Sequence, residues 1–283
     1  MAADTVTVYA VVAAAGSGRR LGEGKPTAFV GIAGRTILER CLDGLSASHA
    51  VDRALLSVPG DILEEAEALL SAQAVQWAPM TVTVVAGGAE RVDSVLAGLE
   101  QIERETDPAG GEGETGRSGD RVLVAVHDVV RCLTPPSAIA GLVRTAREGV
   151  ENNAWTGVVP VIPVTDTVKI VEVAHGGAAD GAEVIRSTPS PGGLRVAQTP
   201  QVFDFDRLLA ANRMQQAREE LDSAHPTGEP PSAHAPIEVA DDSSLMEMAG
   251  ETVVVVPGSD RAFAIVGPED LVRAERLVGD ESD

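Results

Sequence analysis

The sequence predicts an α/β fold, in which a mostly parallel, doubly wound sheet carries a projecting β-arm. Short runs rich in β-branched residues alternate with helical patterns along the chain. Most of these runs lack polar alternation, as expected of strands that are buried on both faces. Alternating strands and helices indicate parallel strands joined by helical crossovers. A pair of strands late in the chain interrupts the alternation, and we interpret this pair as the arm.

Strands and helices can be placed in chain order. The runs expected as strands are Val6–Ala15, Ala54–Pro59, Thr81–Ala86, Arg121–His127, Gly157–Val164 and Thr252–Val256. Apolar residues recur every three or four positions in the segments expected as helices, Thr36–Leu45, Ile62–Gln73, Val92–Glu103 and Ser137–Glu148. Asp61 is a candidate N-cap and Gly149 a candidate C-cap.

The arm is expected at about residues 165–192. There, Thr167–Ala174 and Glu183–Ser187 flank the turn-rich sequence HGGAADG, and such a strand pair suits a dimer contact. Two segments, 105–120 and 221–240, are rich in Gly, Pro and charge and are expected to be flexible. We interpret residues 1–283 as a single domain.

Composition narrows the classes of partner. The 22 basic and 43 acidic residues give a net charge of −21, which disfavours nucleic acid polymers and anionic membranes. No membrane-spanning run or basic signal flank is evident, so we expect a cytoplasmic protein. Cys41 and Cys132 lack metal-ligand spacing, and we expect both to be reduced, and buried or catalytically idle.

The turn after the first strand, AAAGSGRRLG, lies where α/β proteins bind phosphate. Gly16 and Gly18 allow positive φ and close approach of the backbone to a ligand, and Arg19 or Arg20 would meet negative oxygen atoms. Leu21 breaks the dinucleotide pattern G-x-G-x-x-G, and the residues around Lys25 do not form a P-loop. Taken alone, the turn also fits a merely tight connection.

Later stretches add polar groups at strand ends and helix starts. They are GGAERVDSVLAGL (87–99), VLVAVHDVVR (122–131) and EVADDSSLMEM (238–248). Mg²⁺ uses one or two carboxylates together with phosphate oxygens and water, which makes Asp128 and Asp241 candidate ligands. Helix capping explains Asp241 and Asp242 equally well. We interpret His127 as a structural hydrogen-bonding residue.

In this order, the motifs resemble one family. It is the family of cytidylyltransferases that join CTP to 2-C-methyl-D-erythritol 4-phosphate in non-mevalonate isoprenoid synthesis. The resemblance spans nearly the whole chain and implies a nucleotidyltransferase, Rossmann-like fold, Mg²⁺ as cofactor, CTP and a polyol phosphate as substrates, and a homodimer formed through the arm. Beyond the stretches already quoted, it rests on GRTILERCLDGL, PVTDTVKIV, LRVAQTPQVF, DDSSLME and PEDLVRAE.

The resemblance also implies roles for matching residues. The nucleotide and its triphosphate would be bound by Ala14, Ala15, Gly16, Ser17 and Gly18, with Arg20 on the phosphates, and the cytosine by Gly88, Ala89 and Ser94. Asp128 and Asp241 would hold the metal. Val129, Arg131 and Thr167 would contact the acceptor, Thr167 from the partner subunit. Arg20, Lys25 and Asp128 are the expected catalytic residues.

Three positions depart from the family pattern. Thr27 and Ala264 stand where the family has lysine, and Pro191 stands where it has arginine. Lys25, Arg186 or Arg195 are possible replacements for the lost charge. Two readings therefore remain open, a working cytidylyltransferase for this or another polyol or sugar phosphate, and a weakened paralogue that retains nucleotide binding. A dinucleotide-dependent dehydrogenase is not supported, because the glycine fingerprint is broken.

Overall fold

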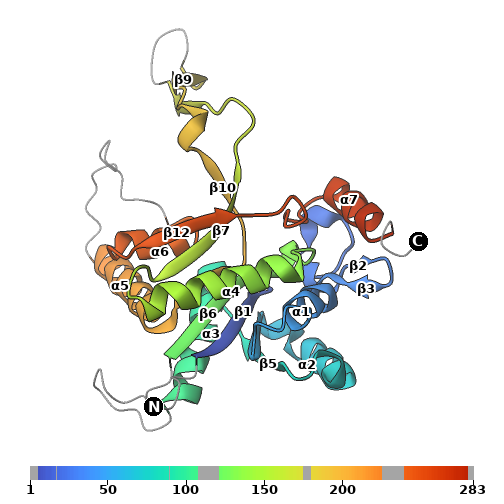
Figure 1. The fold of residues 1–283 in the computed structure, drawn as a ribbon. Helices are drawn as coiled ribbons and strands as arrows, with labels where there is room; N and C mark the ends of the chain where they lie inside the picture. The colour runs from blue at the N-terminus through green and yellow to red at the C-terminus, as the bar shows by residue number, and fades with distance from the viewer. Residues whose placement is uncertain are drawn as a thin grey trace.

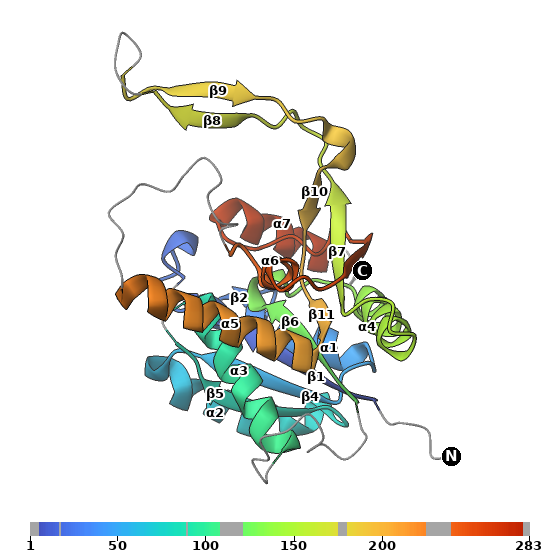
Figure 2. The ribbon, with the colours of Figure 1, turned by 90° about the vertical axis from the view of Figure 1, so that its left-hand side faces the viewer.

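A computed structural model describes residues 6–16, 18–88, 90–107, 121–174, 180–224 and 239–279. Helices pack against both faces of a central sheet, and a two-stranded arm extends away from it (Figures 1 and 2). This arrangement confirms the predicted fold class. None of the helices in the described ranges has the length and apolar content to cross a membrane.

The central sheet has the strand order β10-β7-β11-β6-β1-β4-β5, with β12 paired to β7. Pairing is parallel among β6, β1, β4 and β5, whereas β11 runs antiparallel between β6 and β7. The bounds are β1 Val6–Ala13, β4 Arg53–Val58, β5 Thr81–Ala86, β6 Arg121–Asp128, β7 Gly157–Pro163, β10 Arg195–Ala197, β11 Gln201–Asp204 and β12 Val253–Pro257.

Alternate residues of β1 belong to two different cores. Val8, Ala10 and Val12 face one core, and Tyr9 and Val11 face the other. The first core is covered by α1 (Ile37–Ala47), α2 (Leu63–Gln73), α4 (Pro136–Glu151) and α7 (Pro268–Gly279), and the second by α3 (Arg91–Thr106), α5 (Phe205–Ala224) and α6 (Asp242–Met248). A strand buried on both sides has no polar face, which explains its uninterrupted apolar run.

Smaller elements complete the chain. The strands β2 (Gly31–Ile32) and β3 (Arg35–Thr36) form a short hairpin before α1. The arm consists of β8 (Ile170–Val173) and β9 (Glu183–Ser187), paired antiparallel as expected. Cys41 and Cys132 are buried and unpaired, and burial raises the pKa of the Cys132 thiol to about 12, so that this thiol stays protonated.

Both predicted helix caps are wrong. Asp61 lies inside a 3-10 turn, Gly60–Ile62, that precedes α2, so it does not cap the helix. Gly149 lies within α4, which continues to Glu151 and is capped by Asn152. A glycine is needed at 149 for another reason, since a Cβ there would lie 2.0 Å from Nε1 of Trp155.

The first residues of the two segments predicted to be flexible are helical. The helix α3 includes Glu105, which pairs with Arg53, and α5 continues through 221–224. Residues 108–120 and 225–238 lie outside the described residues. The helix α5 itself was not predicted, because only its first turns bury apolar side chains such as Phe205, Leu208 and Leu209. Its remaining length is polar and carries little helical periodicity.

Candidate functional site

A cleft of about 530 Å³ opens at the carboxyl ends of β1 and β6, where open α/β sheets bind ligands. It brings together the glycine turn, Asp128 and the segment before α7, which are far apart in sequence. Its lining consists of Ala13, Ala15, Gly16, Gly18, Arg19, Arg20, Leu21, Thr27, Arg91, Asp128, Val129, Val130, Ile265 and Val266. The predicted residues Ala15, Gly16, Gly18, Arg20, Asp128 and Val129 are therefore found in one cavity.

The glycine turn is held closed by its own backbone. Gly18 has φ +70°, and a Cβ there would lie 1.9 Å from the carbonyl oxygen of Lys25. The Thr27 amide donates to the Gly16 carbonyl at 3.0 Å. Arg20 follows in a 3-10 turn, Arg19–Leu21, and is exposed at the cleft. Only glycine permits this approach of the two ends of the turn.

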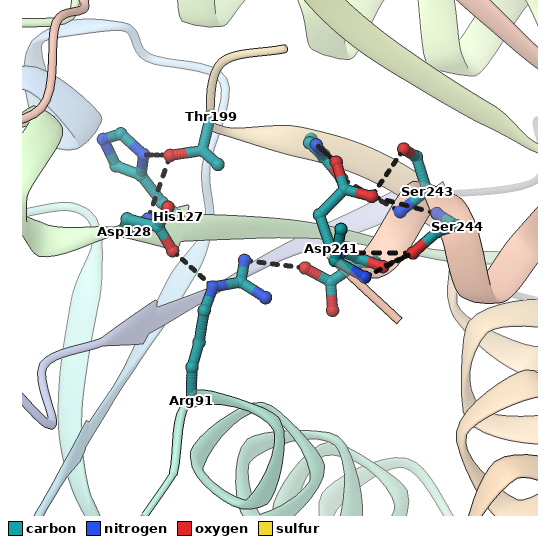
Figure 3. Close-up of polar contacts among 10 residues, drawn as sticks. Arg91, His127, Asp128, Thr199, Asp241, Ser243 and Ser244 are labelled. Atoms are coloured by element: carbon teal, nitrogen blue, oxygen red, sulfur yellow. Dashed lines mark hydrogen bonds and ion pairs between the residues drawn. The ribbon is translucent and has the colours of Figure 1, made fainter. Parts of the chain in front are cut away.

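Asp128 ends β6 directly beside Ala13 of β1, at the mouth of the cleft. Its backbone amide donates to Oγ1 of Thr199 at 3.0 Å, and its Oδ1 accepts from Nε of Arg91 at 2.7 Å (Figure 3). His127 lies 3.0 Å from the same Thr199 oxygen, and burial lowers its pKa to about 4. This confirms the structural interpretation of His127, since the ring is neutral and buried.

Arg91 and Asp242 were not predicted as site residues. Nη2 of Arg91 donates to Oδ2 of Asp242 at 2.8 Å, so Arg91 connects Asp128 to the start of α6. Asp242 is fully buried, and burial raises its pKa while the nearby Arg91 opposes that rise. The only sequence signal for Arg91 is its place three residues after Gly88, and its partners lie 37 and 151 residues away.

Asp241 caps α6. Its Oδ1 accepts from the Ser243 hydroxyl at 2.8 Å and the Ser244 amide at 3.0 Å, and its Oδ2 accepts from Nε2 of Gln201 at 2.7 Å (Figure 3). These hydrogen bonds lower its pKa against the effect of burial. The capping alternative therefore describes the observed contacts, and its role as a metal ligand stays a prediction.

The predicted acceptor residues are divided between two regions. Val129 lines the cleft, and Nη1 of Arg131, two residues later, donates to the Ala262 carbonyl at 2.7 Å. Burial lowers the pKa of Arg131, and its Nε is buried with no hydrogen-bond partner among the residues that the structure describes. Thr167 is exposed at the base of the arm and does not line this cleft.

Near the residues predicted to bind the cytosine, Gly87 lies between two buried serine hydroxyls. A Cβ at Gly87 would lie 2.5 Å from Oγ of Ser57 and 2.7 Å from Oγ of Ser94, and neither hydroxyl has a hydrogen-bond partner in the part of the chain that the structure describes. Ala14 is buried, and its amide donates to the Ser57 carbonyl. Gly88 packs against Asp93, while the predicted residues Ser17 and Ala89 lie outside the described residues.

None of the predicted replacement cations lies in the cleft. Lys25 is exposed on the outside of the glycine turn, and Arg186 pairs with Glu172 on the arm at 2.9 Å. Arg195 donates to the Leu194 carbonyl at 2.7 Å. Thr27 lines the cleft where a lysine was expected, so Arg19, Arg20 and Arg91 are the basic residues of its lining.

The arrangement suits a phosphate-bearing ligand. The glycine turn and Arg20 line the same cleft as Asp128, whose Oδ2 has no hydrogen-bond partner among the described residues. Within the described ranges no three metal-ligating side chains converge, so a divalent cation at Asp128 would take further ligands from phosphate and water.

Comparison with known proteins gives consistent matches. A family model described as 2-C-methyl-D-erythritol 4-phosphate cytidylyltransferase matches residues 8–280. Proteins of that name from Corynebacterium jeikeium and Rhodococcus jostii are 44% identical over 276 residues and 41% identical over 271 residues. The alignments cover 97% and 96% of this chain, and 98% and 95% of the relatives.

Solved structures agree on the fold. A 4-diphosphocytidyl-2C-methyl-D-erythritol synthase from Anaerococcus prevotii superposes with a TM-score of 0.68 at 22% identity, covering 96% of both chains. A cytidylyltransferase from Francisella tularensis gives a TM-score of 0.65 at 20% identity, covering 95% of this chain and 99% of that chain.

Proposed function

The chain belongs to the 2-C-methyl-D-erythritol 4-phosphate cytidylyltransferase family, and on that premise we propose how its cleft transfers CMP from CTP to 2-C-methyl-D-erythritol 4-phosphate. It is a CTP-dependent nucleotidyltransferase of isoprenoid precursor synthesis. The cleft at the carboxyl ends of β1 and β6 carries this proposal, because the glycine turn, Arg20 and Asp128 line one cavity there. The soluble, cytoplasmic setting expected from composition is part of the same proposal.

A phosphate oxygen of the acceptor attacks the α-phosphorus of CTP, and the bond from that phosphorus to the β-phosphate oxygen breaks. Pyrophosphate leaves, and the acceptor gains CMP. The protein contributes orientation and charge, because no covalent enzyme intermediate is needed. We assign the triphosphate to the turn at Gly16 and Gly18, with Arg20 against its oxygen atoms.

Mg²⁺ is the cation that we propose for this site. Asp128 fits as its protein ligand, because Oδ2 has no hydrogen-bond partner among the described residues while Oδ1 is fixed by Arg91. Asp241 would contribute only by sharing oxygens that already cap α6. When bound, Mg²⁺ neutralises phosphate charge and polarises the α-phosphorus.

The acceptor is assigned to the side of the cleft formed by Val129 and the segment before α7. Ile265 donates its amide to the Val130 carbonyl at 2.9 Å, which holds that segment, with Ala264, beside Arg131. Thr167 lies on the arm, so we propose that a partner subunit supplies it in a homodimer. The exposed arm supports this assignment.

The test is a pyrophosphate-release screen with each of the four nucleoside triphosphates and several polyol or sugar phosphates. We expect release with CTP and 2-C-methyl-D-erythritol 4-phosphate, at least tenfold faster than with any other pair. CTP binding by calorimetry without release would favour the weakened paralogue. The double variant Thr27→Lys with Ala264→Lys would then show whether the missing positive charge is the cause. Each preorganised charge in such a site stabilises the transition state by about 3 kcal/mol.

A further inference from the structure

Arg91 joins two carboxylates that come from different parts of the fold. Its Nε donates to Oδ1 of Asp128 at 2.7 Å, and its Nη2 donates to Oδ2 of Asp242 at 2.8 Å. The three side chains are graded in exposure, with 31% for Arg91, 24% for Asp128 and 3% for Asp242. Arg91 thus links the buried Asp242 to Asp128, which lines the cleft, and Figure 3 shows the side chain of Arg91 reaching Asp128.

The contacts of Arg91 fit a clamp better than a phosphate-binding group. Two carboxylates already offset its charge, which leaves little positive field for a triphosphate. Arg20 provides the contrast, because it lines the same cleft, is exposed and has no carboxylate partner among the described residues. Arg20 can therefore contact a ligand, whereas Arg91 already donates to Asp128 and Asp242.

The planar guanidinium makes this clamp directional. Separate N–H groups of one rigid fork reach the two acids, so the position of Asp242 fixes the orientation of Asp128. The Thr199 hydroxyl, which accepts from the Asp128 amide, fixes the backbone of the same residue. Both the main chain and one oxygen of Asp128 are therefore held before a ligand arrives.

We propose that Arg91 is a positioning residue that aligns the Asp128 carboxylate for the divalent cation of the CTP complex, with Asp242 as its anchor. This inference rests on the proposed role of Asp128. It predicts that loss of the clamp weakens cation binding in the presence of CTP, while binding of CTP without the cation is retained. Outer-sphere groups that orient ligands typically change metal affinity by about 10–100-fold.

Removing Arg91 alone leaves the Asp242 charge buried and unpaired, which can unfold the protein. The informative variant is therefore Arg91→Ala combined with Asp242→Asn, which removes the clamp and the buried charge together. Arg91→Lys keeps the charge but not the fork. Arg104→Ala is the matched control, because Arg104 lies on the same helix α3 and, among the described residues, its polar contacts are with Gln101 and Glu100 at the surface.

The full chain is titrated with Mn²⁺ at saturating CTP, and free Mn²⁺ is followed by electron paramagnetic resonance. The half-activating Mg²⁺ concentration and thermal melting are measured in parallel. We expect about 10–100-fold weaker Mn²⁺ binding in the double variant, an intermediate loss in Arg91→Lys, and wild-type binding in Arg104→Ala.

Two results would overturn the inference. One is a folded double variant whose Mn²⁺ affinity and half-activating Mg²⁺ concentration lie within threefold of wild type, with pyrophosphate release still metal-dependent. The other is wild-type protein that releases pyrophosphate without any dependence on a divalent cation, which removes the metal assignment itself. Absence of pyrophosphate release from the wild type would instead contradict the proposed function.

Discussion

The cleft edge and the arm are organised in opposite ways. At the cleft, Asp128 is held by Thr199 and Arg91 of its own chain. On the arm, the side chains of Val171, Val173 and Ile185 share one face and are 46%, 51% and 64% exposed. A two-stranded ribbon with three exposed apolar side chains on one face has marginal stability alone. The polar groups at the cleft are thus fixed by contacts within one chain, whereas the apolar side chains of the arm are exposed and would be covered in the proposed dimer.

Substitution of Asp128 is the most severe test of the cleft. We expect Asp128→Ala to reduce pyrophosphate release by about 100-fold or more, because the proposed cation loses its protein ligand and Arg91 loses its partner at the cleft. The oligomeric state, measured by analytical ultracentrifugation, should not change. If the variant released pyrophosphate at the wild-type rate, the active site could not lie at the carboxyl end of β6.

A double substitution on the arm is expected to change the oligomeric state, which Asp128→Ala leaves unchanged. Val171 and Ile185 are cross-strand partners, so Val171→Asp with Ile185→Asp places two charges on the exposed face. We expect the proposed dimer to dissociate, with at least a tenfold rise in its dissociation constant, because each buried charge would cost more than 1.4 kcal/mol, the value of a tenfold change. Light scattering and turnover are measured together.

Glu172→Gln is the control for the arm variant, since Glu172 lies on the other face and pairs with Arg186. A dissociated protein with unchanged turnover would show that Thr167 does not act across subunits. A dimer that survives both aspartates would place the interface elsewhere.

The sequence predicted some features of the cleft and of the arm, but not the side-chain contacts that hold the cleft together. The glycine turn and Asp128 follow strands whose apolar runs are evident, so their meeting at one sheet edge could be predicted from parallel topology. The clamp through Arg91 could not, because it joins α3 to residues 37 and 151 positions away. The helix α5 escaped detection because most of its length is exposed and polar. The arm was found from its turn-rich connection.

His127 makes the stability of the cleft edge depend on pH. Burial lowers its pKa to about 4, below the unfolded value of about 6.5, so protonation favours unfolding. Stability is full above pH 6.5 and decreases as the pH falls, by about 2 kcal/mol between pH 7.5 and pH 5. In urea denaturation, the free energy of unfolding of His127→Gln should therefore decrease by about 2 kcal/mol less than that of wild type between pH 7.5 and pH 5.

His49→Asn is the control for that comparison. His49 is exposed and has φ +52°, a left-handed conformation that asparagine tolerates. If the free energy of unfolding depends on pH equally in wild type and His127→Gln, the His127 ring must be protonated in the folded protein as readily as in the unfolded chain. That result would contradict the burial of the ring against Thr199.

The smallest expected effect concerns Ser57, whose hydroxyl is buried beside Gly87 and has no hydrogen-bond partner within the described ranges. Such a group loses water without gaining a hydrogen bond, so Ser57→Ala should raise the free energy of unfolding by about 1 kcal/mol. Ser48→Ala is the matched control, because that buried hydroxyl donates to the Leu45 carbonyl at 2.6 Å and accepts from the Ala50 amide. Its removal should destabilise by about the same amount.

Urea denaturation with and without CTP distinguishes the possible reasons for this unpaired hydroxyl. If Ser57→Ala is stabilised without CTP and this stabilisation disappears when CTP is added, the Ser57 hydroxyl is used by the bound ligand. The cleft would then leave a polar group unpaired until its ligand binds, as we propose that the arm leaves apolar side chains exposed until a second subunit binds. Destabilisation equal to that of Ser48→Ala would mean that a buried water already satisfies Ser57. The edge would then be complete before binding, and the contrast with the arm would be sharper.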